Sequence, residues 1–242
     1  MRELYGKLYN VCSGLDGFSG ASHFVGIKGN PLGNVRLMLI GRACNGWEDD
    51  SLRNLSAEEY SAEAEEEWTS SGRWGWIEER GNSLYSTHDS SYCVSRSPFW
   101  DYSKDIWEGL TGMHAEGIWM QEILWTNLYK ISPAERGNPG ADYLKKEKDV
   151  CKEILLEEIR DYRPTHLLFL TGWSWFQDFK DIFDVSTPLG RNISRGKSKN
   201  SVYVEGTARI GSADAVIMCR PEYRDKAAYV AAALGAYSEL AK

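Results

Sequence analysis

The sequence predicts an α/β fold built around a parallel β-sheet, and three observations lead to this fold class. Four short apolar runs, at residues 35–40, 123–126, 166–170 and 215–219, are each followed within two residues by Gly, Asn or Pro. Stretches with helical periodicity lie between these runs, and strands that alternate with helices form βαβ units with right-handed crossovers. The length of 242 residues, with 42% hydrophobic residues, suits one such domain with a sizeable core.

The four apolar runs are predicted to be the strands of the sheet. Three of them are almost uninterrupted by polar residues, which is typical of strands buried on both faces of a parallel sheet. Two helices are predicted between the first two strands. Ser56 and Glu59 form a capping box that opens an acidic helix ending near Trp68, and Ser97-Pro98 begins a second helix.

Two further helices are predicted after the second and fourth strands. Residues 143–162 carry an apolar stripe, and Arg163-Pro164 ends that helix. Residues 223–240 are rich in alanine, with Val230 and Leu234 expected on the inner face.

Charge is unevenly distributed along this chain of net charge −7. Residues 48–80 hold 11 acidic and 3 basic residues, whereas residues 191–209 hold five basic residues and one acidic residue. The basic segment is either a solvated loop or a phosphate-facing surface that includes Arg191, Arg195 and Lys197. We expect a single domain over residues 1–242, with a Trp-rich acidic insert at about 48–110 and most of the ten tryptophans in the core.

The sequence shows no pattern typical of a metal site, a cofactor or a membrane segment. The five cysteines lie far apart, without the close spacing of zinc or iron–sulfur ligands. No apolar run approaches the roughly 18 residues of a membrane span, and the first residues lack the apolar stretch of a signal peptide. We therefore expect a cytoplasmic monomer with reduced thiols, no metal and no cofactor.

Function is expected in the loops that follow the strands, because open parallel sheets bind ligands at the carboxyl ends of their strands. The first such loop, residues 41–47, combines two glycines with Cys44, Asn45 and Trp47. Gly41 lets backbone amides approach a ligand, Asn45 can bond a planar polar edge, and Trp47 can stack on an aromatic ring. The alternative is a tight turn with the indole in the core.

Other catalytic motifs are absent from the sequence. There is no Gly-x-Gly-x-x-Gly fingerprint, Walker loop or Gly-x-Ser-x-Gly elbow, and the four histidines are isolated from Cys44.

Asn127 is unfavourable at a buried strand end, so its side chain is expected to bond either a ligand or neighbouring loop amides. Lys130 is either a phosphate ligand or a surface charge.

The four strand ends together resemble those of the uracil-DNA glycosylase superfamily. The block Trp125-Thr126-Asn127-Leu128-Tyr129-Lys130, followed by Pro133 and Asn138-Pro139, resembles the "T-N-hydrophobic-hydrophobic-K…P…N" block of its bacterial and archaeal branch. The resemblance implies a three-layer α/β/α fold around a four-stranded parallel sheet. It also implies that Gly41 starts the first motif and that Asn127 reads the base edge. Arg220-Pro221 stands where the family has His-Pro.

The sequence departs from the family pattern at two of these motifs. Ala43 stands where the family has a carboxylate or amide, and alanine cannot orient water or act as a base. Arg220 replaces the histidine, and its guanidinium still donates hydrogen bonds and carries positive charge.

Two functions follow from these matches and departures. The first is a divergent protein, non-catalytic or differently catalytic, that binds a nucleobase or a nucleic acid such as single-stranded or damaged DNA. The alternative is an active glycosylase that hydrolyses an N-glycosidic bond in DNA or a nucleotide, with Asn45 and Arg220 as catalytic residues. In either case Gly41, Trp47 and Asn127 contact the base, and Lys130, Arg191, Arg195 and Lys197 contact phosphate.

Overall fold

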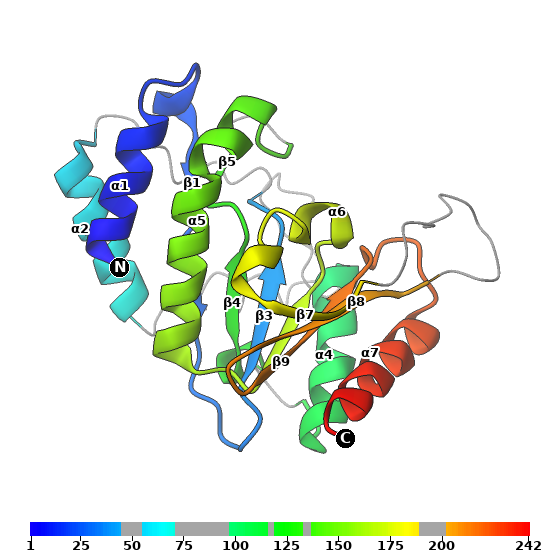
Figure 1. Ribbon diagram of the computed structural model, residues 1–242. Coiled ribbons are helices and arrows are strands. Elements are labelled where there is room, and N and C mark those ends of the chain that lie inside the picture. Colours follow the sequence, from blue (N-terminus) through cyan, green and yellow to red (C-terminus); the bar gives the residue numbers. More distant parts are fainter. Residues whose placement is uncertain (45–54, 71–96, 116–118, 133–136, 189–201) are drawn as a thin grey trace, which may run out of the picture. The chain divides into compact units, whose positions relative to one another are not determined.

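The computed structural model describes residues 1–44, 55–70, 97–115, 119–132, 137–188 and 202–242 (Figure 1). The fold is mixed α/β. Its helices are α1 Arg2–Cys12, α2 Ala57–Thr69, α4 Pro98–Thr111, α5 Ala141–Tyr162, α6 Trp173–Phe176 and α7 Lys226–Leu240. Its strands are β1 Ser22–His23, β2 Ile27–Lys28, β3 Leu37–Gly41, β4 Leu124–Asn127, β5 Ile131–Ser132, β6 His166–Phe169, β7 Asp184–Pro188, β8 Val204–Ile210 and β9 Ala213–Met218.

All four predicted strands are present, as β3, β4, β6 and β9. They are neighbours in a seven-stranded sheet with the order β2-β4-β3-β6-β9-β8-β7. β6 runs parallel to β9, from the pair His166–Asp214 to the pair Phe169–Ile217. Every residue of β3 is buried, as expected for an apolar strand covered on both faces.

The sheet differs from the expected four parallel strands because it continues beyond β9. β8 pairs antiparallel with β9, and β7 pairs antiparallel with β8, so the sheet is mixed. β8 was not predicted, because its polar and glycine residues interrupt the apolar pattern and it belongs to the segment interpreted as a basic loop. Arg209 of that segment lies in β8 and pairs with Asp214, with Nε 2.7 Å from Oδ1.

The described residues divide into two compact units, each assembled from three segments of the chain. Unit 1 comprises Met1–Lys28, Ile40–Ser71 and Trp125–Arg163, and unit 2 comprises Gly29–Leu39, Gly72–Leu124 and Pro164–Lys242. The predicted acidic insert therefore contributes to both units. Its described tryptophans Trp68, Trp100 and Trp107 are buried, whereas Trp74 and Trp76 lie outside the described residues.

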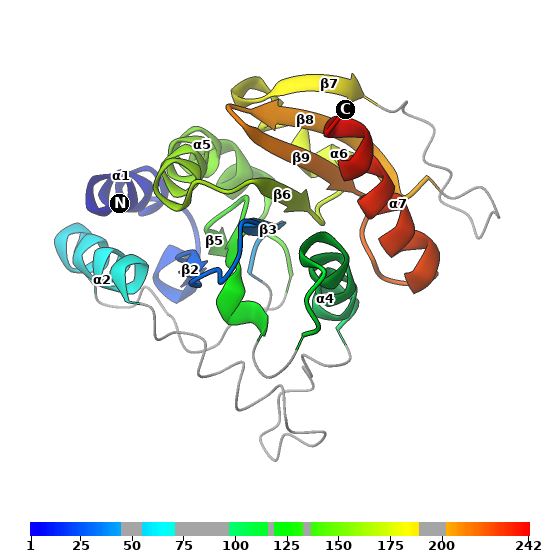
Figure 2. The same ribbon diagram turned by 90° about the horizontal axis from the view of Figure 1, so that it is seen from below.

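Unit 1 contains α1, α2 and α5, which Figure 2 shows grouped together. The predicted capping box at the start of α2 is confirmed: the Ser56 side chain accepts from Glu59 N–H, and the Glu59 side chain accepts from Ser56 N–H. α5 ends as predicted, with Arg163 in the left-handed conformation (φ 53°) before Pro164. Its buried stripe contains apolar residues, among them Cys151, Leu155 and Ile159, together with two glutamates, Glu147 and Glu158.

Unit 2 contains α4 and α7. The predicted helix start at Ser97-Pro98 is confirmed. In α7 the buried residues are Tyr229, Ala233, Ala236 and Tyr237. The predicted inner residues Val230 and Leu234 are only half-buried, because the two tyrosines set the orientation of the helix. Tyr229 donates to the carbonyl of Cys219 at 2.5 Å, and Tyr237 donates to the carbonyl of Leu167 at 2.7 Å.

Among the described helices, none combines the length and apolar character that a membrane crossing requires.

Candidate functional site

The structure describes four of the predicted site residues. Gly41, Asn127 and Lys130 belong to unit 1, and Arg220 belongs to unit 2. Five others lie outside the described residues: Asn45, Trp47, Arg191, Arg195 and Lys197.

In unit 1 the ends of β3 and β4 lie side by side. The backbone N–H of Leu128 donates to the carbonyl of Gly41, and that of Tyr129 donates to the carbonyl of Arg42, both at 2.9 Å. The Ser132 hydroxyl donates to the carbonyl of Cys44 at 2.8 Å. The first loop thus meets the segment 127–132 over several residues, with the buried Asn127 at the end of β4.

Lys130 differs from its prediction as a phosphate ligand or a surface charge. Its side chain is fully buried, with Nζ 2.8 Å from Glu158 Oε1 and 2.5 Å from Thr126 Oγ1. The ammonium therefore forms an internal ion pair and is not available to a phosphate. A buried lysine needs such a counter-ion because desolvation of an unpaired charge is costly.

Glu158 completes this internal network. The Thr126 hydroxyl lies 3.0 Å from Glu158 Oε1 and 2.9 Å from Oε2, and Lys130 donates to both Thr126 and Glu158. Burial raises the pKa of Glu158, whereas the charge and hydrogen bonds of Lys130 act in the opposite direction. Thr126 precedes Asn127, so the network fixes the end of β4 from inside the unit.

Glu147 holds the same segment at a second point. Its Oε2 accepts the backbone N–H groups of Lys130 at 3.1 Å and Ile131 at 3.0 Å, and it lies 3.5 Å from Cys151 Sγ. Its Oε1 is buried without a hydrogen-bond partner in the described structure. Burial is the main cause that raises the pKa of Glu147 to about 7. Sequence reasoning missed both carboxylates, because glutamates on an amphipathic helix are usually solvated.

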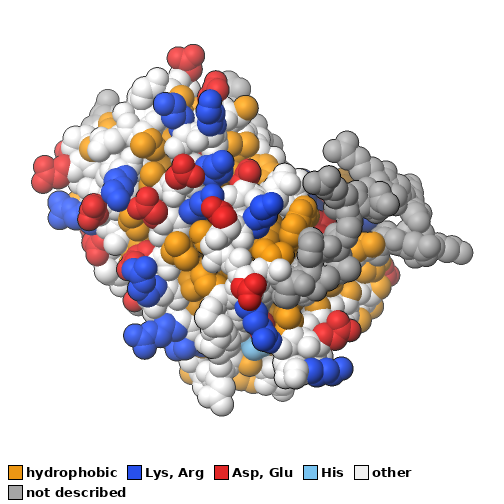
Figure 3. Space-filling view, viewed as in Figure 1, with side chains coloured by type: hydrophobic (Ala, Val, Ile, Leu, Met, Phe, Trp, Pro, Cys, Tyr) orange, Lys and Arg blue, Asp and Glu red, His pale blue; other side chains and the backbone are white. Residues whose placement is uncertain are grey.

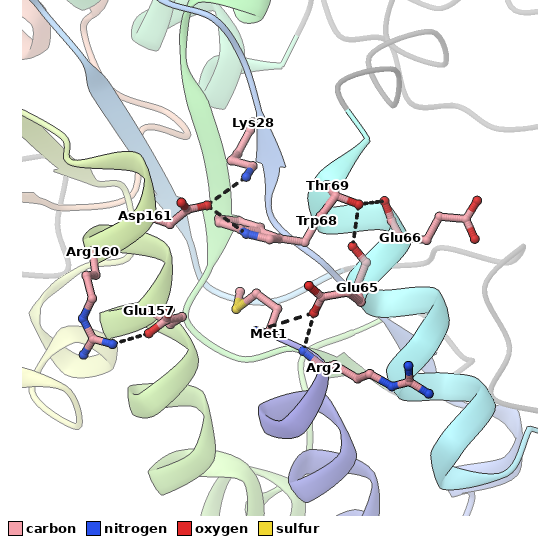
Figure 4. Close-up of polar contacts among 10 residues, drawn as sticks. All are labelled: Met1, Arg2, Lys28, Glu65, Glu66, Trp68, Thr69, Glu157, Arg160 and Asp161. Atoms are coloured by element: carbon pink, nitrogen blue, oxygen red, sulfur yellow. Dashed lines mark hydrogen bonds and ion pairs between the residues drawn. The ribbon is translucent and has the colours of Figure 1, made fainter.

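The carboxyl-terminal part of α5 also binds the end of α2 through Trp68 (Figure 4). Trp68 Nε1 donates to Asp161 Oδ2 at 3.0 Å, and Lys28 Nζ donates to the same oxygen at 2.8 Å while lying 4.3 Å from the indole centroid. The Lys28 hydrogen bond is the main cause that lowers the pKa of Asp161. Trp68 is therefore a structural residue that joins two helices.

In unit 2 the ends of β6 and β9 also lie side by side. Gly172, with φ 77°, donates its N–H to the carbonyl of Met218 at 2.9 Å. Arg220 follows β9, and its guanidinium is half-exposed and paired with Glu222. Glu205, which sequence reasoning missed, is 3% exposed and accepts the N–H of Trp173.

The described residues also include potential metal ligands and two buried or half-buried histidines. Within the described residues, no three His, Cys, Asp or Glu side chains are grouped to hold a metal ion. His23 packs against Tyr60, with ring centroids 5.1 Å apart. His166 packs against Tyr237 at 5.0 Å. On the face shown in Figure 3, basic and acidic side chains are interspersed, without a broad basic stripe among the coloured residues.

Comparisons of the chain with models of known protein families and with curated protein sequences gave no match. The resemblance to uracil-DNA glycosylases therefore stays a prediction from the strand-end motifs.

Proposed function

We propose that the chain is a divergent uracil-DNA glycosylase-like protein that binds a nucleobase, either free or in single-stranded or damaged DNA. In this proposal Asn127 reads the base edge, Gly41 gives the base close access to the backbone, and Trp47 stacks on the ring. The proposal includes a monomer that acts in the cytoplasm.

The observation that carries the proposal is the way in which Asn127 is held. Its segment is bonded to the first loop on one side and is fixed by Glu147 and the Lys130–Glu158 pair on the other. An amide placed on such a rigid support keeps its orientation before a ligand arrives, which reduces the entropy cost of binding. A planar amide can form paired hydrogen bonds to a base edge.

Tryptophan fluorescence titration with uracil, the other free bases and a uracil-containing single-stranded oligonucleotide tests the proposal. We expect Asn127→Ala to weaken binding by roughly tenfold or more, because a paired amide contact contributes about 1–3 kcal/mol. Asn10→Ala, on the exposed part of α1, is the matched control and should leave the Kd unchanged. An unchanged Kd in a folded Asn127→Ala protein would contradict the role of Asn127.

The alternative function, hydrolysis of an N-glycosidic bond, is favoured by Arg220. Its half-exposed guanidinium after β9 can stabilise a developing negative charge. Ala43, beside the end of β3, offers no group to activate water. Formation of abasic sites in uracil-containing single-stranded DNA, lost in Arg220→Ala and retained in Arg160→Ala, would support hydrolysis. Binding without any abasic product would support the non-catalytic function.

A further inference from the structure

The segment after Asn127 contains a second feature, at its contact with α5. Two consecutive backbone N–H groups, of Lys130 and Ile131, converge on a single oxygen, Glu147 Oε2. The other oxygen of this fully buried carboxylate has no partner in the described structure. The hydrogen bonds that hold the segment therefore depend directly on the charge state of one side chain.

We propose that Glu147 is a positioning residue which makes nucleobase binding at Asn127 depend on the protonation of its carboxyl group. The inference rests on the proposed function, because it assumes that Asn127 contacts the base. The ionised carboxylate accepts charge-assisted hydrogen bonds from the two N–H groups, and such bonds are about twice as strong as neutral ones. A proton taken up on Oε1 leaves only neutral hydrogen bonds at Oε2, so the segment and its asparagine are held less firmly.

Titratable groups from several elements surround Glu147. Its neighbours are Cys12 of α1, Tyr60 of α2, Tyr143 and Cys151 of α5 itself, and Lys130 of the held segment. Burial raises the pKa of both tyrosines and both thiols, so all four stay neutral near pH 7.

Burial raises the pKa of Glu147 to about 7, so this carboxyl group changes its charge near neutral pH. Acidification from pH 8 to pH 5.5 should therefore weaken the hydrogen bonds from the backbone N–H groups of Lys130 and Ile131 to Glu147.

The variant Glu147→Gln imitates the protonated carboxyl group at every pH. Its amide oxygen can accept the two N–H groups, and its NH2 group takes the place of the unpartnered Oε1. Glu157→Gln is the matched control, because Glu157 lies on the same helix and pairs with the exposed Arg160. The two variants make the same chemical change, at a buried and at a more accessible position.

The first readout is independent of any ligand. Nuclear magnetic resonance of the full chain should show the amide signals of Lys130 and Ile131 titrating near pH 7 in the unsubstituted protein and in Glu157→Gln, but not in Glu147→Gln. The titration of these two amide signals can be measured in the unsubstituted chain alone, so the proposal can be tested even if Glu147→Gln does not fold. Amide signals that stay constant from pH 5.5 to pH 8.5 would overturn it.

The second readout is the Kd for uracil and for a uracil-containing single-stranded oligonucleotide, measured by tryptophan fluorescence. We expect binding by the unsubstituted chain to weaken about fivefold to tenfold from pH 8 to pH 5.5. Glu147→Gln should bind weakly and equally at both pH values. It should also be more stable than the unsubstituted chain at pH 8, since it lacks a buried charge. A purely structural role would make stability and affinity change together.

The outcomes separate this inference from the proposed function. If the amide signals titrate but the Kd is the same at both pH values, the role of Glu147 in binding is overturned and the proposed function is unaffected. No binding at any pH overturns the proposed function and, with it, the coupling.

Discussion

Replacement of Lys130 by methionine tests the ion pair inside unit 1. Lys130 Nζ and Glu158 Oε1 lie 2.8 Å apart, and both side chains are fully buried. Methionine keeps most of the lysine stem but removes the ammonium, so Glu158 retains the Thr126 hydroxyl and loses its counter-ion. Removing one partner of a buried ion pair costs roughly 3–5 kcal/mol. We expect Lys130→Met to lower the free energy of unfolding by about this amount at pH 8.

The assay is urea unfolding of the full chain, followed by far-ultraviolet circular dichroism between pH 5 and pH 8. Without the ammonium, the pKa of Glu158 in the folded variant rises further above its value in the unfolded chain. A carboxyl group with a raised folded pKa contributes stability that is present at low pH and is lost as the pH rises through that pKa. The deficit of Lys130→Met relative to the unsubstituted chain should therefore shrink towards pH 5.

Two further variants make this prediction refutable. The double variant Lys130→Met, Glu158→Leu should lose less stability than the two single variants together, with a coupling of about 1–3 kcal/mol. Lys145→Met, on the exposed side of α5, should change stability by no more than about 0.5 kcal/mol. Additive single effects, or a cost of Lys130→Met below about 1 kcal/mol at pH 8, would refute the reasoning.

Two other predictions concern neighbouring buried groups. Burial raises the pKa of Glu147 from 4.5 to about 7, so its contribution to the free energy of unfolding should fall by roughly 2–3 kcal/mol from pH 5 to pH 8. Glu147→Gln should remove this loss, and parallel stability curves for the two proteins would contradict the prediction. A Cβ on Gly26 would lie 2.9 Å from Glu158 Oε1 and 3.1 Å from Trp68 Cζ3. Gly26→Ala should therefore cost about 1–3 kcal/mol in thermal unfolding, whereas Gly33→Ala, with no atom within 4 Å, should cost much less.

The elements that could be predicted from the sequence are those whose signals are local. The apolar run 35–40, interrupted only by Arg36, contains most of β3, and the capping box at Ser56 opens α2. Both signals depend on residues that are adjacent in the sequence. The end of α5 at Arg163-Pro164 is equally local.

The internal support of the site could not be predicted in this way. Lys130 and Glu158 are 28 positions apart, and Glu147 reaches the backbone of Lys130 from another element. A lysine after a strand and a glutamate in a helix are both normally solvated, so only the packing of α5 against the segment 127–132 shows that these charges are buried. β8 was missed for a related reason, since a strand whose pattern is broken by Gly206 is defined by its pairing with β9.

The interleaving of the two units has a consequence for how the protein folds. The chain passes from one unit to the other five times, at residues 28–29, 39–40, 71–72, 124–125 and 163–164. A single cut in the gene therefore cannot release either unit as an intact piece. On the ribosome, unit 1 lacks its last segment until Arg163 has emerged, and unit 2 has to wait for the strands and the helix beyond it. Contacts between such distant segments slow folding, so we expect this protein to reach its native state only after synthesis is almost complete.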